Sequence, residues 1–201
     1  MRTSTKAWAL AMALAAGACA GDGPSDADRE VRAAPVVDSV LPMEVMVMRF
    51  RAGLDEPTRL GHGADSRDEL VERVVAALQA ADTAALEAVA VDRAEFAWLY
   101  FPSSSFARPP YELPPALSWF RIQERNRAAV LRALHELGGR PLRLDGYTCS
   151  PEPLVEGENR IWTGCSLRIM PESGAAVSLP LFGSILERDG RFAVLGYADD
   201  F

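Results

Sequence analysis

The chain has 201 residues, which is one domain of ordinary size once a leader is set aside, and 49% of them are hydrophobic, enough to form a core. Its formal net charge is -7 at pH 7, and Lys6 is the only lysine. A surface that binds nucleic acid requires clustered cations, and this sequence has no such cluster. After the first residues, no apolar run approaches the ~20 residues that span a bilayer. We therefore expect no nucleic-acid partner and no spanning helix in the body of the chain.

Residues 1–18 have the pattern of an export signal. Arg2 and Lys6 precede an apolar stretch, and Ala16 and Ala18 form the A-x-A pattern of a cleavage site. The stretch is too short to cross a bilayer, so we expect it to be removed as a signal peptide.

Cys19 follows this stretch directly and has two interpretations. The small-residue box that ends in a cysteine resembles a bacterial lipoprotein signal, which implies that Cys19 becomes the lipidated, palmitate-bearing N-terminus of a membrane lipoprotein. The alternative is a secreted or periplasmic soluble protein in which Cys19 is an incidental thiol. Residues 19–42 are polar and aperiodic, which predicts a flexible tether, and an anchor followed by a tether would hold the domain at the cell envelope. By resemblance to lipoprotein sorting, the absence of Asp at position 20 favours the periplasmic side of the outer membrane.

Cys149 and Cys165 are equally distant from a turn that we predict near Gly157. A hairpin centred there would place the two cysteines opposite each other, and in an oxidising compartment a disulfide between them would stabilise the fold by ~3 kcal/mol. The alternatives are two buried thiols or half of a metal site. A metal site has little support, because the chain has only two histidines, His62 and His135, and no C-x-x-C pair. We expect a disulfide bond and neither a metal nor another cofactor.

The remaining sequence predicts helices first and strands after them. We expect a short helix and a loop over 43–65 and three helices over 66–101. Capping boxes begin at Ser66 and Asp92, and Asp82 and Thr83 start the short helix between them. Pro115 predicts the first turn of a long helix that ends at Gly138. Four alternating stretches, separated by the turn sequences EGEN, PESG and RDG, then predict an antiparallel meander. This order predicts an α+β fold.

Residues 66–201 resemble the NTF2-like superfamily, a cystatin-like α+β cone in which N-terminal helices pack on the concave face of a curved antiparallel sheet. The helical run 66–101, the long helix 115–138 and the C-terminal sequence LFGSILERDGRFAVLGYADDF carry the resemblance. It implies that the concavity of the sheet holds a ligand or an active site. The family usually has a strand between its short helices and its long helix, and none is predicted here.

Aromatic residues are concentrated in one part of the chain, which has 4 Trp, 4 Tyr and 8 Phe, half of them between residues 96 and 120. They either form an apolar pocket or partner surface, or pin a Pro-rich loop to the core. On a helical wheel the apolar arc of the long helix contains Trp119, Phe120, Val130, Leu131, Leu134 and Leu137.

Three polar residues, Gln123, Asn126 and Arg127, fall within that arc. They either line a wet cavity or form a buried network, with Arg127 paired to a carboxylate such as Glu95 or Glu112. The candidate ligand-binding residues are Trp98, Tyr100, Tyr111, Trp119, Gln123 and Arg127.

Catalysis has weaker support than binding. The chain has no G-x-S-x-G elbow and no phosphate-binding loop, and His62 lies between glycines with no second ligand near it in the sequence. Some NTF2-like enzymes use an Asp base with a Tyr donor, for which Asp145, Tyr147 and Tyr197 are the candidates. We expect a non-enzymatic exported lipoprotein that binds a small apolar ligand or an envelope protein. The alternative is an isomerase- or hydrolase-type enzyme with a carboxylate in the cone.

Overall fold

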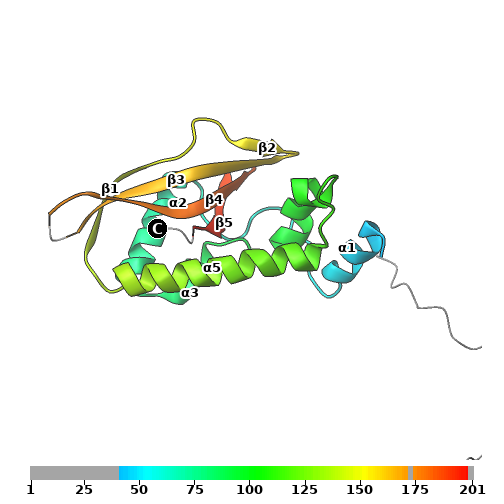
Figure 1. Ribbon diagram of the computed structural model, residues 1–201, viewed down its shortest axis with the longest axis horizontal. Coiled ribbons are helices and arrows are strands. Elements are labelled where there is room, and N and C mark those ends of the chain that lie inside the picture. The colour runs from blue at the N-terminus through cyan, green and yellow to red at the C-terminus, as the bar shows by residue number, and fades with distance from the viewer. Residues whose placement is uncertain (1–40, 172–173, 199–201) are drawn as a thin grey trace, which may run out of the picture. The chain divides into compact units, whose positions relative to one another are not determined.

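The structure is a computed structural model that describes residues 41–171 and 174–198. The expected signal peptide, Cys19 and the tether up to residue 40 lie outside the described residues. The described chain begins with helices and ends with strands (Figure 1), in the order α1 (Met43–Arg51), α2 (Arg67–Gln79), α3 (Thr83–Ala88), α4 (Arg93–Glu95), the π-helical turn η2 (Phe96–Tyr100), the 3-10 turns η3 (Phe101–Ser103) and η4 (Ser105–Ala107), α5 (Pro115–Leu137), β1 (Leu142–Thr148), β2 (Leu154–Glu156), β3 (Asn159–Pro171), β4 (Val177–Arg188) and β5 (Arg191–Tyr197). Within the described ranges, no helix combines the length and apolar character that a membrane span requires.

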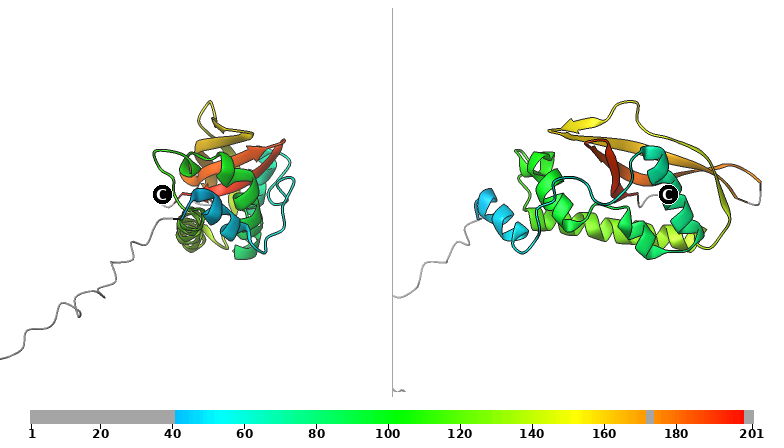
Figure 2. Two further views of the ribbon diagram at one scale, coloured as in Figure 1. Left: turned by 90° about the vertical axis from the view of Figure 1, so that its right-hand side faces the viewer. Right: turned by 180° about the vertical axis from the view of Figure 1, so that it is seen from behind.

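The strands form one antiparallel sheet in the order β1-β3-β4-β5, with β2 also paired to β3. Irregular pairing in β1, β3 and β4 marks β-bulges, which increase the local twist of a sheet. The helix α5 runs along the length of the sheet in Figure 1, and the view from behind in Figure 2 shows the same arrangement. The predicted α+β fold, with N-terminal helices packed on a C-terminal antiparallel sheet, is confirmed.

The helix starts follow the predicted caps, with one difference. Ser66 accepts a hydrogen bond from Glu69 N (3.1 Å), and Asp82 accepts one from Ala85 N (3.0 Å). The capping box of Asp92 and Glu95 has both of its reciprocal bonds. The predicted box at Ser66 has only one, because the Glu69 carboxylate accepts from Asp65 N (2.9 Å) instead of from the backbone of Ser66.

Buried apolar side chains form two clusters. The first joins α2, α3 and α5 to the sheet, and its members include Leu70, Ala129 and Val194. The second surrounds Phe96, whose ring contacts those of Phe50, Tyr100, Phe101 and Trp119 at centroid distances of 5.8, 5.8, 5.5 and 5.1 Å. Part of the aromatic cluster between residues 96 and 120 therefore packs in the core, which agrees with the second of the two interpretations.

The buried face of α5 differs from the predicted apolar arc. Phe120 and Leu131 are 58% and 60% exposed, so their placement on a core-facing arc is wrong. The helix instead buries Asn126, Ala129 and Ala133 beside Val130, the one member of the predicted arc that is buried. Small residues on a packed face shorten the distance between elements, and the larger side chains beside them remain outside.

Cys149 and Cys165 form the predicted disulfide. In the pairing of β1 with β3, Thr148 lies opposite Ser166, so the two cysteines occupy the next position along the ladder. The turn at Gly157 joins β2 to β3, and both β1 and β2 pair with β3. A disulfide of this kind is typical of proteins that fold in an oxidising compartment outside the cytosol.

Candidate functional site

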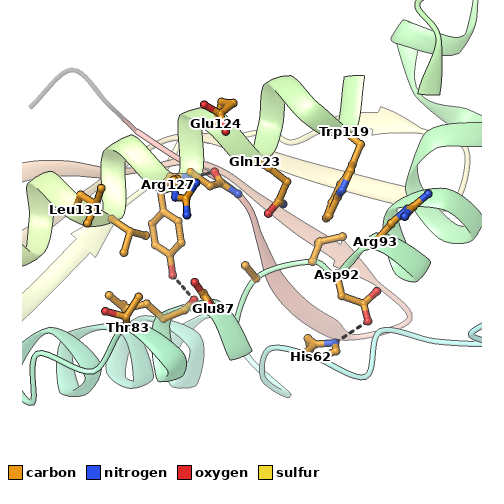
Figure 3. A pocket seen from close by; sticks show the side chains of 16 residues that line it. His62, Thr83, Glu87, Asp92, Arg93, Trp119, Gln123, Glu124, Arg127 and Leu131 are labelled. Atoms are coloured by element: carbon orange, nitrogen blue, oxygen red, sulfur yellow. Dashed lines mark hydrogen bonds and ion pairs between the residues drawn. The ribbon is translucent and has the colours of Figure 1, made fainter. Parts of the chain in front are cut away.

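A cavity of about 570 Å³ lies between α5 and the segment that contains α3 and the start of α4 (Figure 3). We call it the helix-side cavity. Its α5 wall is formed by residues four positions apart, Trp119, Gln123, Arg127 and Leu131, which share one face of a helix. The other lining residues are His62, Thr83, Leu86, Glu87, Ala90, Val91, Asp92, Arg93, Glu124, Asn126, Val130 and Tyr197.

The back of the cavity is fixed by buried hydrogen bonds. The hydroxyl of Tyr197 donates to Leu86 O (2.9 Å), and Tyr197 N donates to Asn126 Oδ1 (2.8 Å). Burial raises the pKa of Tyr197 above its ordinary value, so its hydroxyl remains a donor. These bonds join α3, α5 and β5, and the cavity is therefore formed before any ligand arrives.

The rim of the cavity carries charges of both signs. Arg127, Glu87 and Glu124 are exposed, and so is Arg93, whose guanidinium lies over the ring of Phe50 at 4.7 Å. The pairing of Arg127 with Glu95 or Glu112 is wrong in the described part of the chain, because Glu95 is occupied by backbone N–H groups and Glu112 makes no ion pair there. Arg127 therefore faces solvent and the cavity, where it can bind a polar group of a ligand.

The structure brings three of the six candidate ligand-binding residues together. Trp119, Gln123 and Arg127 line the helix-side cavity. The other three are elsewhere: Trp98 lies under the guanidinium of Arg51, Tyr111 is 59% exposed, and Tyr100 lines a different cavity.

That second cavity, of about 320 Å³, lies between α5 and the sheet, and we call it the sheet-side cavity. Glu156 supplies its carboxylate: Oε1 accepts from Ser105 N (2.8 Å), and Oε2 is buried without a hydrogen-bond partner in the described chain. Burial, and to a lesser extent the charge of Glu156, raises the pKa of Tyr100 above its ordinary value. Sequence reasoning missed Glu156, because nothing near it in the chain marks it as inward-facing.

The residues suggested for catalysis do not meet in either cavity. Asp145 forms an ion pair with Arg168 (2.6 Å), and the hydroxyl of Tyr147 donates to Asp68 Oδ1 (2.6 Å). Asp145 also lies where the pairing of β1 with β3 shifts, which interrupts the simple alternation on which the prediction depended. Tyr197 lies at the back of the helix-side cavity with its hydroxyl bonded to Leu86 O.

His62 has acidic neighbours that the sequence does not place beside it. Its Nδ1 lies 3.6 Å from Asp92 Oδ2 and 3.3 Å from Glu95 Oε1, and His62 and Asp92 both line the helix-side cavity (Figure 3). The loop that carries His62 reaches α4 because Gly61 N and His62 N donate to Glu95 Oε1 (2.6 and 3.0 Å). His62 therefore has two carboxylates beside it that the sequence did not lead us to expect.

No protein-family model, no curated protein and no solved structure matches the chain.

Proposed function

We propose that this protein is an exported, non-enzymatic binding protein that holds a small amphipathic molecule in the helix-side cavity. The observation that carries this proposal is the cavity itself: its volume of about 570 Å³ falls in the range of pockets that hold small molecules. Ala90, Trp119 and Leu131, which are not buried, offer apolar surface to the body of a ligand. Gln123 and Arg127 offer hydrogen bonds to a polar or anionic group at its end.

The place of action is part of the proposal. The disulfide supports export, and the lipoprotein-like sequence that ends in Cys19 supports a lipid anchor at the envelope, on the periplasmic side of the outer membrane. Helices that cover one side of an antiparallel sheet agree with an NTF2-like cone, which is likewise a proposal.

The enzymatic alternative has one specific observation in its favour. Glu156 is a carboxylate in the sheet-side cavity with an unpartnered oxygen, beside Tyr100. We favour binding, because Glu156 Oε1 is already used to hold Ser105 N, and because the sheet-side cavity is the smaller of the two. A role of Glu156 in holding η4 against β2 accounts for that contact.

The proposal is tested by ligand titration of the full chain. Because Trp119 lines the cavity, its fluorescence should change as small amphipathic acids are added, and Trp119→Phe should remove that change. Arg127→Ala should weaken binding of an acid by about tenfold, the loss expected for a charged hydrogen bond worth about 1.4 kcal/mol. Arg121→Ala is the matched control, because Arg121 is exposed on the same helix and does not line the helix-side cavity.

Equal affinity of Arg127→Ala and Arg121→Ala for every acid that binds would contradict this cavity as the binding site. A ligand whose affinity falls in Glu156→Gln but not in Arg127→Ala would assign binding to the sheet-side cavity instead.

A further inference from the structure

Three ligand-type side chains converge at the edge of the helix-side cavity. His62 Nδ1 is 3.3 Å from Glu95 Oε1 and 3.6 Å from Asp92 Oδ2. One donor atom from each of the three residues can be chosen so that all lie within 4.8 Å of one another. This is a mixed set of one imidazole nitrogen and two carboxylate oxygens, the donors that bind zinc in proteins.

Backbone hydrogen bonds hold all three residues in place. Glu95 N donates to Asp92 Oδ1 (2.7 Å), and Asp92 N donates to Glu95 Oε2 (3.0 Å). Glu95 Oε1 accepts from both Gly61 N and His62 N, which fixes the loop that carries the imidazole. Ligating carboxylates in metal sites are commonly held by hydrogen bonds of this kind, so the arrangement does not need an ion to form.

The imidazole nitrogen that faces the carboxylates makes no hydrogen bond in the described chain, although it lies within ion-pair distance of both of them. His62 Nδ1 is buried, although the rest of its side chain is 40% exposed. A buried polar atom without a hydrogen bond costs free energy, and such atoms are rare in folded proteins. A cation placed between Nδ1 and the two carboxylates would supply the missing interaction.

The two separations that involve His62 Nδ1 fit a small cation better than they fit a hydrogen bond. Zinc bonds of about 2.0–2.2 Å in a tetrahedron place neighbouring ligand atoms about 3.3–3.6 Å apart. The two separations measured from His62 Nδ1, 3.3 and 3.6 Å, have that size. Two carboxylates and a neutral imidazole also balance the charge of a divalent ion.

We infer that His62, Asp92 and Glu95 form a binding site for a divalent transition-metal cation, with Zn²⁺ as the expected ion. Glu95 is 2% exposed and forms the closed side, whereas His62 and Asp92 are 40% and 43% exposed and line the cavity. The remaining coordination position therefore opens toward water and the helix-side cavity. The site depends only on groups of this chain and stands whether or not the cavity binds an organic ligand.

The test is a titration of the metal-stripped full chain with ZnCl₂ by isothermal calorimetry. The protein is prepared without a histidine tag, with its disulfide intact and with Cys19→Ser, so that no added imidazole or N-terminal thiol competes for the ion. We expect one Zn²⁺ per chain, with a Kd in the micromolar range or tighter. His62→Ala should weaken binding by at least about tenfold, since loss of even an outer partner of a ligand costs 10–100-fold.

The chain offers a matched control in its other histidine. His135 is exposed on α5, so His135→Ala should bind Zn²⁺ like the parent. Asp92→Asn removes one of the proposed carboxylate ligands. The variant should still fold, because Asn keeps an oxygen for the capping bond from Glu95 N and is itself a good N-cap. It too should weaken binding.

Absence of Zn²⁺ binding by the parent would overturn the inference. The same holds if His62→Ala or Asp92→Asn binds as tightly as the parent does. Arg127→Ala separates the two proposals, because it should lose affinity for an amphipathic acid and keep its affinity for Zn²⁺.

Discussion

Glu95 connects more of this molecule than its place in a short helix indicates. It is 2% exposed, and its two oxygens accept hydrogen bonds from Gly61 N, His62 N and Asp92 N. The bond with Asp92 belongs to a capping box that the sequence predicts. The bonds with Gly61 and His62 cross more than thirty positions of the chain, and no local pattern announces them.

At the residue scale, Glu95→Ala should strongly destabilise the fold. The substitution leaves three backbone N–H groups without their acceptor, and loss of hydrogen bonds to a charged group should lower the free energy of unfolding by about 3 kcal/mol or more. Urea denaturation measures this change. Glu72→Ala is the control: Glu72 is exposed on α2, so the change should stay within about 0.5 kcal/mol. Similar losses in the two variants would show that the buried contacts of Glu95 contribute little.

Among the elements, α2 is attached to the sheet through its first turn. The hydroxyl of Tyr147 in β1 donates to Asp68 Oδ1 (2.6 Å), and the guanidinium of Arg67 lies over the ring of Trp162 in β3 at 3.9 Å. Two neighbouring residues of one helix thus hold two neighbouring strands. The attachment explains why the start of α2 lies firmly beside the disulfide-linked part of the sheet.

The contribution of the α2–β1 attachment to the stability of the fold should fall as the pH becomes alkaline. Burial, then the hydrogen bond to Asp68 and the charge of Asp68, raise the pKa of Tyr147 to about 12. An unfolded tyrosine has a pKa of about 10. Below about pH 10 both states keep the proton and the contribution to stability is complete; as pH rises from about 10 to about 12 the unfolded state loses its proton first, and the contribution is lost.

Tyr147→Phe should therefore be less stable than the parent by about 1 kcal/mol at pH 7 and should lose less stability between about pH 10 and 12. Tyr147→Phe should still lose some stability at alkaline pH, because the pKa values of Tyr100 and Tyr197 are also raised. Urea denaturation at several pH values measures both effects. At pH 7, Tyr111→Phe should match the parent, because the ring of Tyr111 is 59% exposed. If the free energy of unfolding of Tyr147→Phe and of the parent falls equally between about pH 10 and 12, the Tyr147–Asp68 contact is excluded as a source of the alkaline loss of stability.

For the whole molecule, the disulfide and the proposed lipid anchor both favour the cell envelope as the place where the protein works. Leu41–Phe201 forms one compact unit, and its two cysteines are joined. The third cysteine, Cys19, is the proposed site of lipidation. An oxidised domain that follows an acylated N-terminus is the pattern expected of a protein at the envelope.

Intact mass spectrometry tests both parts of this account. Protein from the membrane fraction of the cells that make it should have the mass of residues 19–201 with acyl groups added and the two disulfide hydrogens removed. Treatment with a reductant should add those hydrogens and leave the acyl groups in place. A chain without acyl groups in the soluble fraction would refute the anchor, and an oxidised chain in that fraction would still agree with export.

Local sequence patterns, which span only about four residues each, allowed most of the helices and strands to be predicted. The caps at Asp82 and Asp92, Pro115 at the start of α5 and the turns at EGEN and RDG appear where they were expected. The exposure of Phe120 and Leu131 could not be foreseen, because it depends on which face of α5 meets the rest of the fold.

The candidate site is less predictable for the same reason. Trp119, Gln123 and Arg127 are evident from their spacing on one helix, but the opposite wall comes from α3 and from the loop at His62. That loop is held against β5 at Gly63, where a Cβ atom would lie only 1.9 Å from Phe192 O. Contacts of this range follow from packing and have no signature in the neighbouring residues.

The residues that line the helix-side cavity differ in how far they can be substituted without disturbing the core. Trp119 also packs against Phe96, and Asn126 and Tyr197 also join α5 to β5, so a change at any of these three disturbs the core. Gln123, Arg127 and Leu131 line the same cavity from the middle of α5, and none of them makes such a second contact within the described chain. Descendants of this protein can therefore acquire new ligand preferences along that one line of α5 while the fold that supports it stays intact.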